Sequence, residues 1–157
     1  PALFGFLSTM DRSNLSRPVV ILGLAGILPQ AFCLLIAMFS VSYQSVGLAA
    51  GCFYAAIILS FLGGLWWMAG LLSGETLTWI YVLAIGPSLA GWTALLPMVS
   101  GWPWPRPSLV ALALILLASP MVDLAISRHI TFPRGWLRLR VAMATGLGSL
   151  TLAMAAF

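Results

Sequence analysis

Hydrophobic residues fill the chain in five long blocks, and most of the charged residues lie in the short breaks between these blocks. The longest stretch without a charged residue covers residues 18–74 and contains two apolar blocks in succession. The hydrocarbon core of a bilayer is about 30 Å thick, and a helix needs about 20 apolar residues to cross it. The pattern therefore predicts an all-α, polytopic integral membrane protein.

The blocks predict a bundle of five transmembrane helices joined by short loops. Short links between successive helices are typical of antiparallel neighbours in an up-and-down bundle. We expect an N-terminal interfacial segment over residues 1–17 and a single transmembrane domain over residues 18–157. The predicted spans are approximately 18–43, 47–72, 77–98, 109–127 and 139–157.

The arginines predict the orientation of this bundle. All seven basic residues of the chain are arginine. With five spans, one side of the membrane would hold Arg12, Arg17, Arg128, Arg134, Arg138 and Arg140, and the other side only Arg106. Because cytoplasmic loops are enriched in Lys and Arg, we expect a cytoplasmic N-terminus in a multi-pass protein of the bacterial inner (plasma) membrane.

Composition narrows the classes of partner. Only 6% of the residues are charged, against about 25% in soluble domains. The net charge of +4 belongs to loops rather than to a hydrated basic face, so we expect no nucleic acid partner and infer no soluble small-molecule substrate. Arg128, Arg134 and Trp136 are instead expected to bind anionic lipid headgroups on the cytoplasmic side.

Small residues recur within the predicted spans and allow close approach of helix backbones. Helices in lipid associate through such close fit and through polar contacts. We expect the second span to be central, with its small-residue face against the third. The residues predicted to mediate helix packing are Gly47, Gly51, Ala56, Ser60, Gly63, Gly64, Gly86, Ala90, Gly91, Gly146 and Gly148.

Asp123 is the one acidic residue inside a predicted span, which makes it a candidate for function. We expect an intramembrane ion pair with Arg138 or Arg140, which enter the next span. Two alternatives remain open at this point, namely a proton or ion site and a carboxylate that faces headgroup water. Gln30, beside Pro29, is expected to hydrogen-bond across helices.

Residues for catalysis and cofactor binding are scarce. The sole histidine, His129, lies in a predicted loop, whereas haem in membrane proteins is usually ligated by a histidine within a span. Cys33 and Cys52 fall inside apolar blocks and are interpreted as small hydrophobic residues. We therefore predict no metal, no cofactor and no enzymatic activity. Trp66 is assigned to the aromatic belt at the inner membrane interface, and Trp92, at mid-span, to helix packing.

Several segments resemble one membrane-protein family. Segment 54–67, YAAIILSFLGGLWW, resembles the tyrosine-to-tryptophan signature of the transmembrane protein 69 family, a proteobacterial and mitochondrial group. Segments 22–29 (LGLAGILP), 87–96 (PSLAGWTALL) and 136–140 (WLRLR) followed by Thr145 are similar to its other motifs. The family usually has a polar or basic residue where this chain has Trp66. The resemblance implies a five-helix inner-membrane fold and no established activity.

The leading functional hypothesis is an accessory, structural or assembly subunit that packs against a larger membrane complex, respiratory or photosynthetic. Its basis is the scarcity of reactive residues beside an abundance of packing and interfacial residues. The alternative is a small transporter or a lipid- or quinone-handling protein, in which the kinks expected at Pro29 and Pro87 open a cavity.

Overall fold

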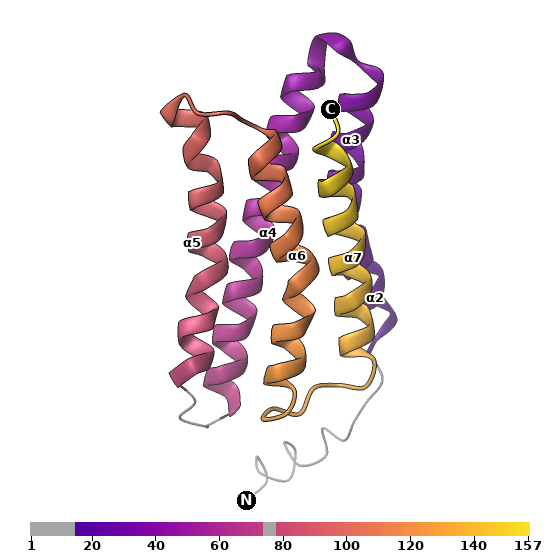
Figure 1. Ribbon diagram of the computed structural model, residues 1–157. Coiled ribbons are helices and arrows are strands. Elements are labelled where there is room, and N and C mark those ends of the chain that lie inside the picture. The colour runs from indigo at the N-terminus through magenta and orange to yellow at the C-terminus, as the bar shows by residue number, and fades with distance from the viewer. Residues whose placement is uncertain (1–14, 74–77) are drawn as a thin grey trace, which may run out of the picture.

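The computed structural model describes residues 15–73 and 78–157, and these form a bundle of long helices without a strand (Figure 1). Residues 1–14 and 74–77, with most of the expected interfacial segment, lie outside the described residues. The elements in chain order are α2 (Arg17–Ala25), α3 (Leu28–Phe39), the 3₁₀-helix η1 (Val41–Tyr43), α4 (Gln44–Ser73), α5 (Thr78–Ser100), α6 (Arg106–Ile126) and α7 (Trp136–Met154).

The helices run alternately up and down, with α2 and α3 together forming the first rod (Figure 1). Helix α4 is central, as the sequence predicts, because it packs against α3, α5, α6 and α7. Helix α5 lies at one edge of the bundle in Figure 1, where it contacts α4 and α6. At 30 residues, α4 is about 45 Å long and exceeds the thickness of the hydrocarbon core.

Four helical segments are long and apolar enough to cross a membrane: Arg17–Phe39, Val41–Ser73, Thr78–Ser100 and Arg106–Ile126. The prediction of an all-helical chain with several helices long and apolar enough to cross a membrane is therefore confirmed. Helix α7 runs beside these segments in the bundle and packs chiefly against α6 (Figure 1). It is not one of the four, and its first two turns carry two arginines, Arg138 and Arg140.

The first predicted span is interrupted. One helix was expected over residues 18–43, but α2 ends at Ala25, α3 begins at Leu28 and the helix stops at Phe39. Pro29 stands in the first turn of α3, where its missing N–H costs no helical hydrogen bond. The Tyr54 hydroxyl of α4 donates to the carbonyl oxygen of Gly26 in the break. By contrast, Pro87 and Pro120 lie inside continuous helices.

The remaining helices match the predicted spans with shifted ends. Helix α6 starts at Arg106 rather than near 109, since Pro107 suits a first helical turn. Helix α7 starts at Trp136 because Gly135 supplies the preceding left-handed turn, with φ of 88°.

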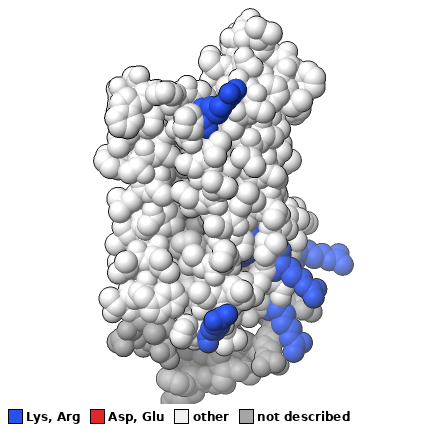
Figure 2. All heavy atoms as spheres, viewed as in Figure 1, with Lys and Arg blue, Asp and Glu red and all other residues white. Residues whose placement is uncertain are grey.

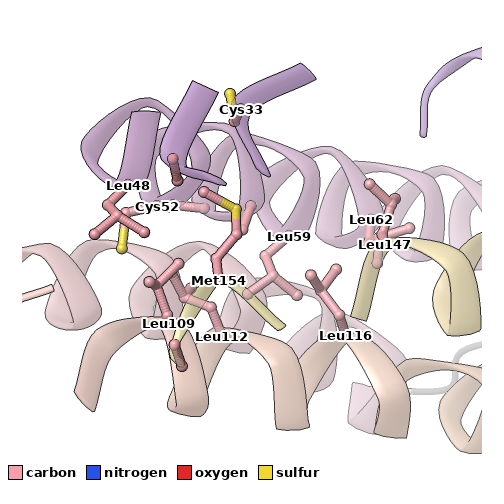
Figure 3. Packing of buried hydrophobic residues seen from close by; sticks show 14 residues of the cluster. Cys33, Leu48, Cys52, Leu59, Leu62, Leu109, Leu112, Leu116, Leu147 and Met154 are labelled. Atoms are coloured by element: carbon pink, nitrogen blue, oxygen red, sulfur yellow. The ribbon is translucent and has the colours of Figure 1, made fainter. Parts of the chain in front are cut away.

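The core lies where α3, α4, α6 and α7 meet. Figure 3 shows Leu59 of α4, Leu112 and Leu116 of α6, and Met154 at the end of α7 converging there. Each of these four side chains is at most 1% exposed. Dispersion contacts of this density hold helices together in lipid, where exclusion from water contributes little.

Glycines allow four close helix contacts around α4. A Cβ on Gly63 would lie 2.2 Å from the Ala84 carbonyl oxygen of α5, and one on Gly91 of α5 would lie 3.1 Å from the Ala56 carbonyl oxygen. A Cβ on Gly47 would lie 2.9 Å from the carbonyl oxygen of Cys33 in α3. Gly51 makes room for the tip of Met154, since its Cβ would meet the Met154 methyl at 2.3 Å. The small residues of α4 therefore face three neighbouring helices, and not α5 alone as predicted.

Two glycines of α7 also lie at contacts. A Cβ on Gly146 would meet Ile27 at 2.6 Å, and one on Gly148 would meet Leu117 of α6 at 2.6 Å. The helix-packing role predicted for Gly64 and Gly86 is wrong within this chain, because a Cβ at either position would meet no atom within 4 Å. Ser60 is likewise exposed and Ala90 only half-buried. Ser60, Gly64 and Gly86 therefore do not contribute to close packing within the described helices.

Candidate intramembrane site

Asp123 and Arg140 form a buried ion pair between α6 and α7. The Arg140 Nε donates to Asp123 Oδ2 at 2.8 Å, and Nη2 lies 2.8 Å from the same oxygen. Both side chains are 3% exposed. Of the two predicted partners, the structure selects Arg140. Arg138 is exposed, because two residues along a helix correspond to about 200° of rotation.

A third helix completes this cluster. Trp66 of α4 is 5% exposed, and its Nε1 donates to Asp123 Oδ1 at 2.8 Å. Both carboxylate oxygens are thus hydrogen-bonded, which a buried charge requires. The assignment of Trp66 to the interfacial belt is wrong. Its sequence neighbour Trp67, 42% exposed, instead forms an edge contact with Tyr81 at a centroid distance of 5.0 Å.

The Trp66–Asp123–Arg140 cluster adjoins a cavity. The cavity has a volume of about 310 Å³ and lies between α2, α4, α6 and α7. Its walls are almost entirely apolar, and only Ser119 and Arg140 contribute polar side chains. Ser119 donates to the Leu116 carbonyl of its own helix at 2.8 Å. Arg140 is therefore the polar side chain of the wall with donors to spare.

Comparison with known proteins places the chain in a family. Residues 15–156 match the sequence model of the family described as 'protein of unknown function (DUF3429)'. This chain belongs to the DUF3429 family. The match extends over all the described helices and so includes both the cluster and the cavity. No curated protein and no solved structure matches the chain.

A second buried polar contact joins α3 and α7 of this DUF3429 chain. Gln30 of α3 is 0% exposed, and its Nε2 donates to the Thr151 hydroxyl of α7 at 2.9 Å. Met154 Sδ lies 3.4 Å from the same nitrogen. The Thr151 hydroxyl in turn donates to the Leu147 carbonyl at 2.7 Å. Gln30 thus makes the interhelical hydrogen bond that the sequence predicts.

The predicted headgroup residues gather at one end of the DUF3429 fold. Arg134, Trp136 and Arg138 line a hollow formed by the α6–α7 link, and Trp136 stacks on Phe132 at 5.8 Å between ring centroids. Arg128 is exposed in the same link but does not line the hollow. Figure 2 shows basic side chains concentrated toward this end. Arg106 is distant from them in the fold, because it begins α6 and the link follows the end of that helix.

Reactive groups of the DUF3429 fold are dispersed. Within residues 15–73 and 78–157, no three His, Cys, Asp or Glu side chains are close enough to hold a metal ion. Cys33 and Cys52 are buried and free of a disulfide. His129 packs edge-on against Trp79, with ring centroids 5.7 Å apart. The arrangement offers fixed donors and apolar walls, which suit binding and packing.

Proposed function

We propose that this DUF3429 protein is a non-catalytic accessory or assembly subunit that docks on a transmembrane helix of a larger membrane complex. The docking face is the outward side of the α4–α5 pair. It is defined by four residues: Ser60 and Gly64 of α4, and Ser88 and Trp92 of α5.

The observation that carries the proposal is the exposure of Trp92. Its side chain is 60% exposed, which contradicts its predicted packing role within this chain. Trp92 lies eight residues before the end of α5 at Ser100, or about 12 Å of helix rise. That depth is below the interface that indole rings prefer, and the indole N–H has no acceptor among the described residues. A partner helix would cover the ring and offer an acceptor.

The other residues of the face have the character of a helix-docking surface. Ser60, Gly64 and Ser88 are exposed, and Gly64 has open space where a Cβ would stand. Ser88 lies beside α4, because its Oγ would be 3.7 Å from a Cβ on Gly63. Small and hydroxyl-bearing side chains at such a surface let a second backbone approach closely and hydrogen-bond.

The proposed setting is the inner membrane of a bacterium, with a cytoplasmic N-terminus and α7 as the fifth crossing. The basic link between α6 and α7 supports this orientation, as does the position of Arg17 at the start of α2. The hollow with Arg134 and Trp136 would then lie at the inner leaflet and contact anionic headgroups. The DUF3429 match is compatible with membership of the transmembrane protein 69 group, which we propose as the finer assignment.

Site-specific photo-crosslinking in native membranes tests the docking. A benzophenone side chain at position 60 or 92 should give adducts with one discrete membrane protein. The same probe at Leu114 of α6, which is 58% exposed, should give lipid adducts only. Adducts of the same kind from all three positions, or a protein that purifies alone in mild detergent, would overturn the proposal.

A matched pair of glycines separates docking from folding. Gly64→Leu should reduce copurification of the partner at least tenfold without reducing the yield of folded protein. Gly86 is equally open but lies six residues from Trp92, about 120° away around α5. Gly86→Leu should therefore leave copurification unchanged. Equal effects of the two substitutions would contradict a face confined to Ser60, Gly64, Ser88 and Trp92.

A further inference from the structure

The cavity between α2, α4, α6 and α7 is a candidate ligand-binding site, separate from the docking face. We infer that it binds a neutral apolar molecule through a carbonyl oxygen, which accepts hydrogen bonds from Arg140. The inference rests on the shape and lining of the cavity, on the unused donors of Arg140 and on the charge balance of the Trp66–Asp123–Arg140 cluster.

The size and lining of the cavity suit a small lipid-like molecule. Its volume of about 310 Å³ is at the lower end of the range for small-molecule sites, which starts near 300 Å³. Phe61 and Leu62 of α4, Leu116 of α6 and Met143 of α7 provide an apolar wall. The break between α2 and α3 contributes Gly26, whose carbonyl is already engaged by Tyr54. The backbone break therefore helps to form the cavity without leaving that acceptor open.

Arg140 has donors that this chain does not satisfy. A guanidinium carries five N–H groups. Among the described residues, Asp123 is the one partner of this guanidinium: Nε donates to Oδ2, and Nη2 lies 2.8 Å from the same oxygen without forming an aligned hydrogen bond. Leaving such donors unpaired in an apolar setting costs free energy. A ligand oxygen in the adjoining cavity would remove that cost.

The charge balance selects a neutral acceptor. Asp123 already neutralises Arg140, and its two oxygens accept from Trp66 and Arg140. A second anion would share one positive charge with this carboxylate in a medium of low dielectric constant, where an uncompensated charge is costly. A carbonyl oxygen accepts the same hydrogen bonds without adding charge. Two kinds of membrane molecule offer it, namely quinone rings and the ester groups of glycerolipids.

Binding to the purified full-length protein in detergent distinguishes these sources. The probes are decylubiquinone for the quinone, dioctanoylglycerol for the ester, decylbenzene for the apolar body alone and decanoate for an anion. We expect decylubiquinone or dioctanoylglycerol to bind at least tenfold more tightly than decylbenzene, and whichever binds more tightly identifies the source. Equal affinity for decylbenzene, or tighter binding of decanoate than of both carbonyl compounds, would overturn the inference.

Two sets of variants assign the binding to this cavity. Ala144 of α7 lines the cavity and is 3% exposed, whereas Ala142, two residues earlier, is exposed. Ala144→Leu should abolish binding of the carbonyl probes, and the control Ala142→Leu should retain it. The double variant Asp123→Leu/Arg140→Met removes both charges together and should reduce carbonyl affinity to that of decylbenzene. Retention of the carbonyl preference in this folded double variant would show that Arg140 is not the donor.

Discussion

Trp66 of α4 and Trp92 of α5 lie on neighbouring helices, but their side chains have opposite surroundings. Trp66 is 5% exposed and donates its N–H to Asp123, whereas Trp92 is 60% exposed and its N–H has no acceptor among the described residues. In hydrocarbon, an unpaired N–H is costly. The α4–α6–α7 side of the bundle thus satisfies its buried tryptophan within one chain, and under the proposed function the α4–α5 outer face is completed by a partner.

The largest expected effect comes from removing the Asp123 carboxylate on the α4–α6–α7 side of the bundle. Asp123→Leu leaves Arg140 buried without its counterion and should destabilise the isolated protein by about 3–5 kcal/mol. Asp123→Leu/Arg140→Met should recover most of this loss, since a buried ion pair contributes little beyond an apolar pair of similar size. Unfolding free energies from titration with a denaturing detergent provide the measurement. A single variant as stable as wild type would show that the pair is dispensable.

The next largest change in unfolding free energy is expected from replacing a tryptophan by phenylalanine. Trp66→Phe removes the donor to a buried carboxylate and should cost about 1.5–3 kcal/mol in the same unfolding assay. Trp92→Phe removes an N–H that bonds nothing in the described chain and should change the stability of the isolated protein by less than about 0.5 kcal/mol. If the two variants lost equal stability, the contrast between the surroundings of Trp66 and Trp92 would be wrong.

Adjacent glycines on α4 allow the same comparison for backbone packing. A Cβ on Gly63 would lie 2.2 Å from the backbone of α5 and must push the helices apart, so Gly63→Ala should cost about 1–3 kcal/mol. Gly64 has open space, and Gly64→Ala should be neutral or stabilise by up to about 1 kcal/mol through helix propensity. Comparable melting temperatures for the two variants would contradict the packing described here.

The hydrophobic pattern was enough to predict the helices because crossing a bilayer requires long apolar segments. It placed α4 in the centre through its small residues, and it placed Asp123 within reach of Arg140 through the antiparallel order of α6 and α7. These are consequences of length, spacing and chain direction. Each can be read from one segment or from two consecutive segments.

The rotation of each helix about its axis could not be predicted in the same way. Gly63 and Gly64 are adjacent in sequence, and so are Trp66 and Trp67, yet one member of each pair is buried and the other exposed. When apolar residues surround a helix, hydrophobicity does not mark the inward face. The cavity was missed for the same reason, since its walls come from four helices whose mutual rotation sets its shape. Gly63 and Gly70 both face α5. On a helical wheel they fall on the same face of α4 as Ala56, and this pattern in the sequence could have identified the face that packs against α5.

The smallest effect concerns the break in the first rod, where the backbone itself is completed by a side chain. The Tyr54 hydroxyl donates to the Gly26 carbonyl between α2 and α3, and Tyr54→Phe should cost about 0.5–1.5 kcal/mol. Tyr43→Phe is the control, because Tyr43 is 63% exposed and should not change stability. Hydrogen exchange of the amides next to Gly26 should rise in Tyr54→Phe alone. Unchanged exchange would mean that the break is held by the packing of Ile27 against Gly146 and not by the hydroxyl.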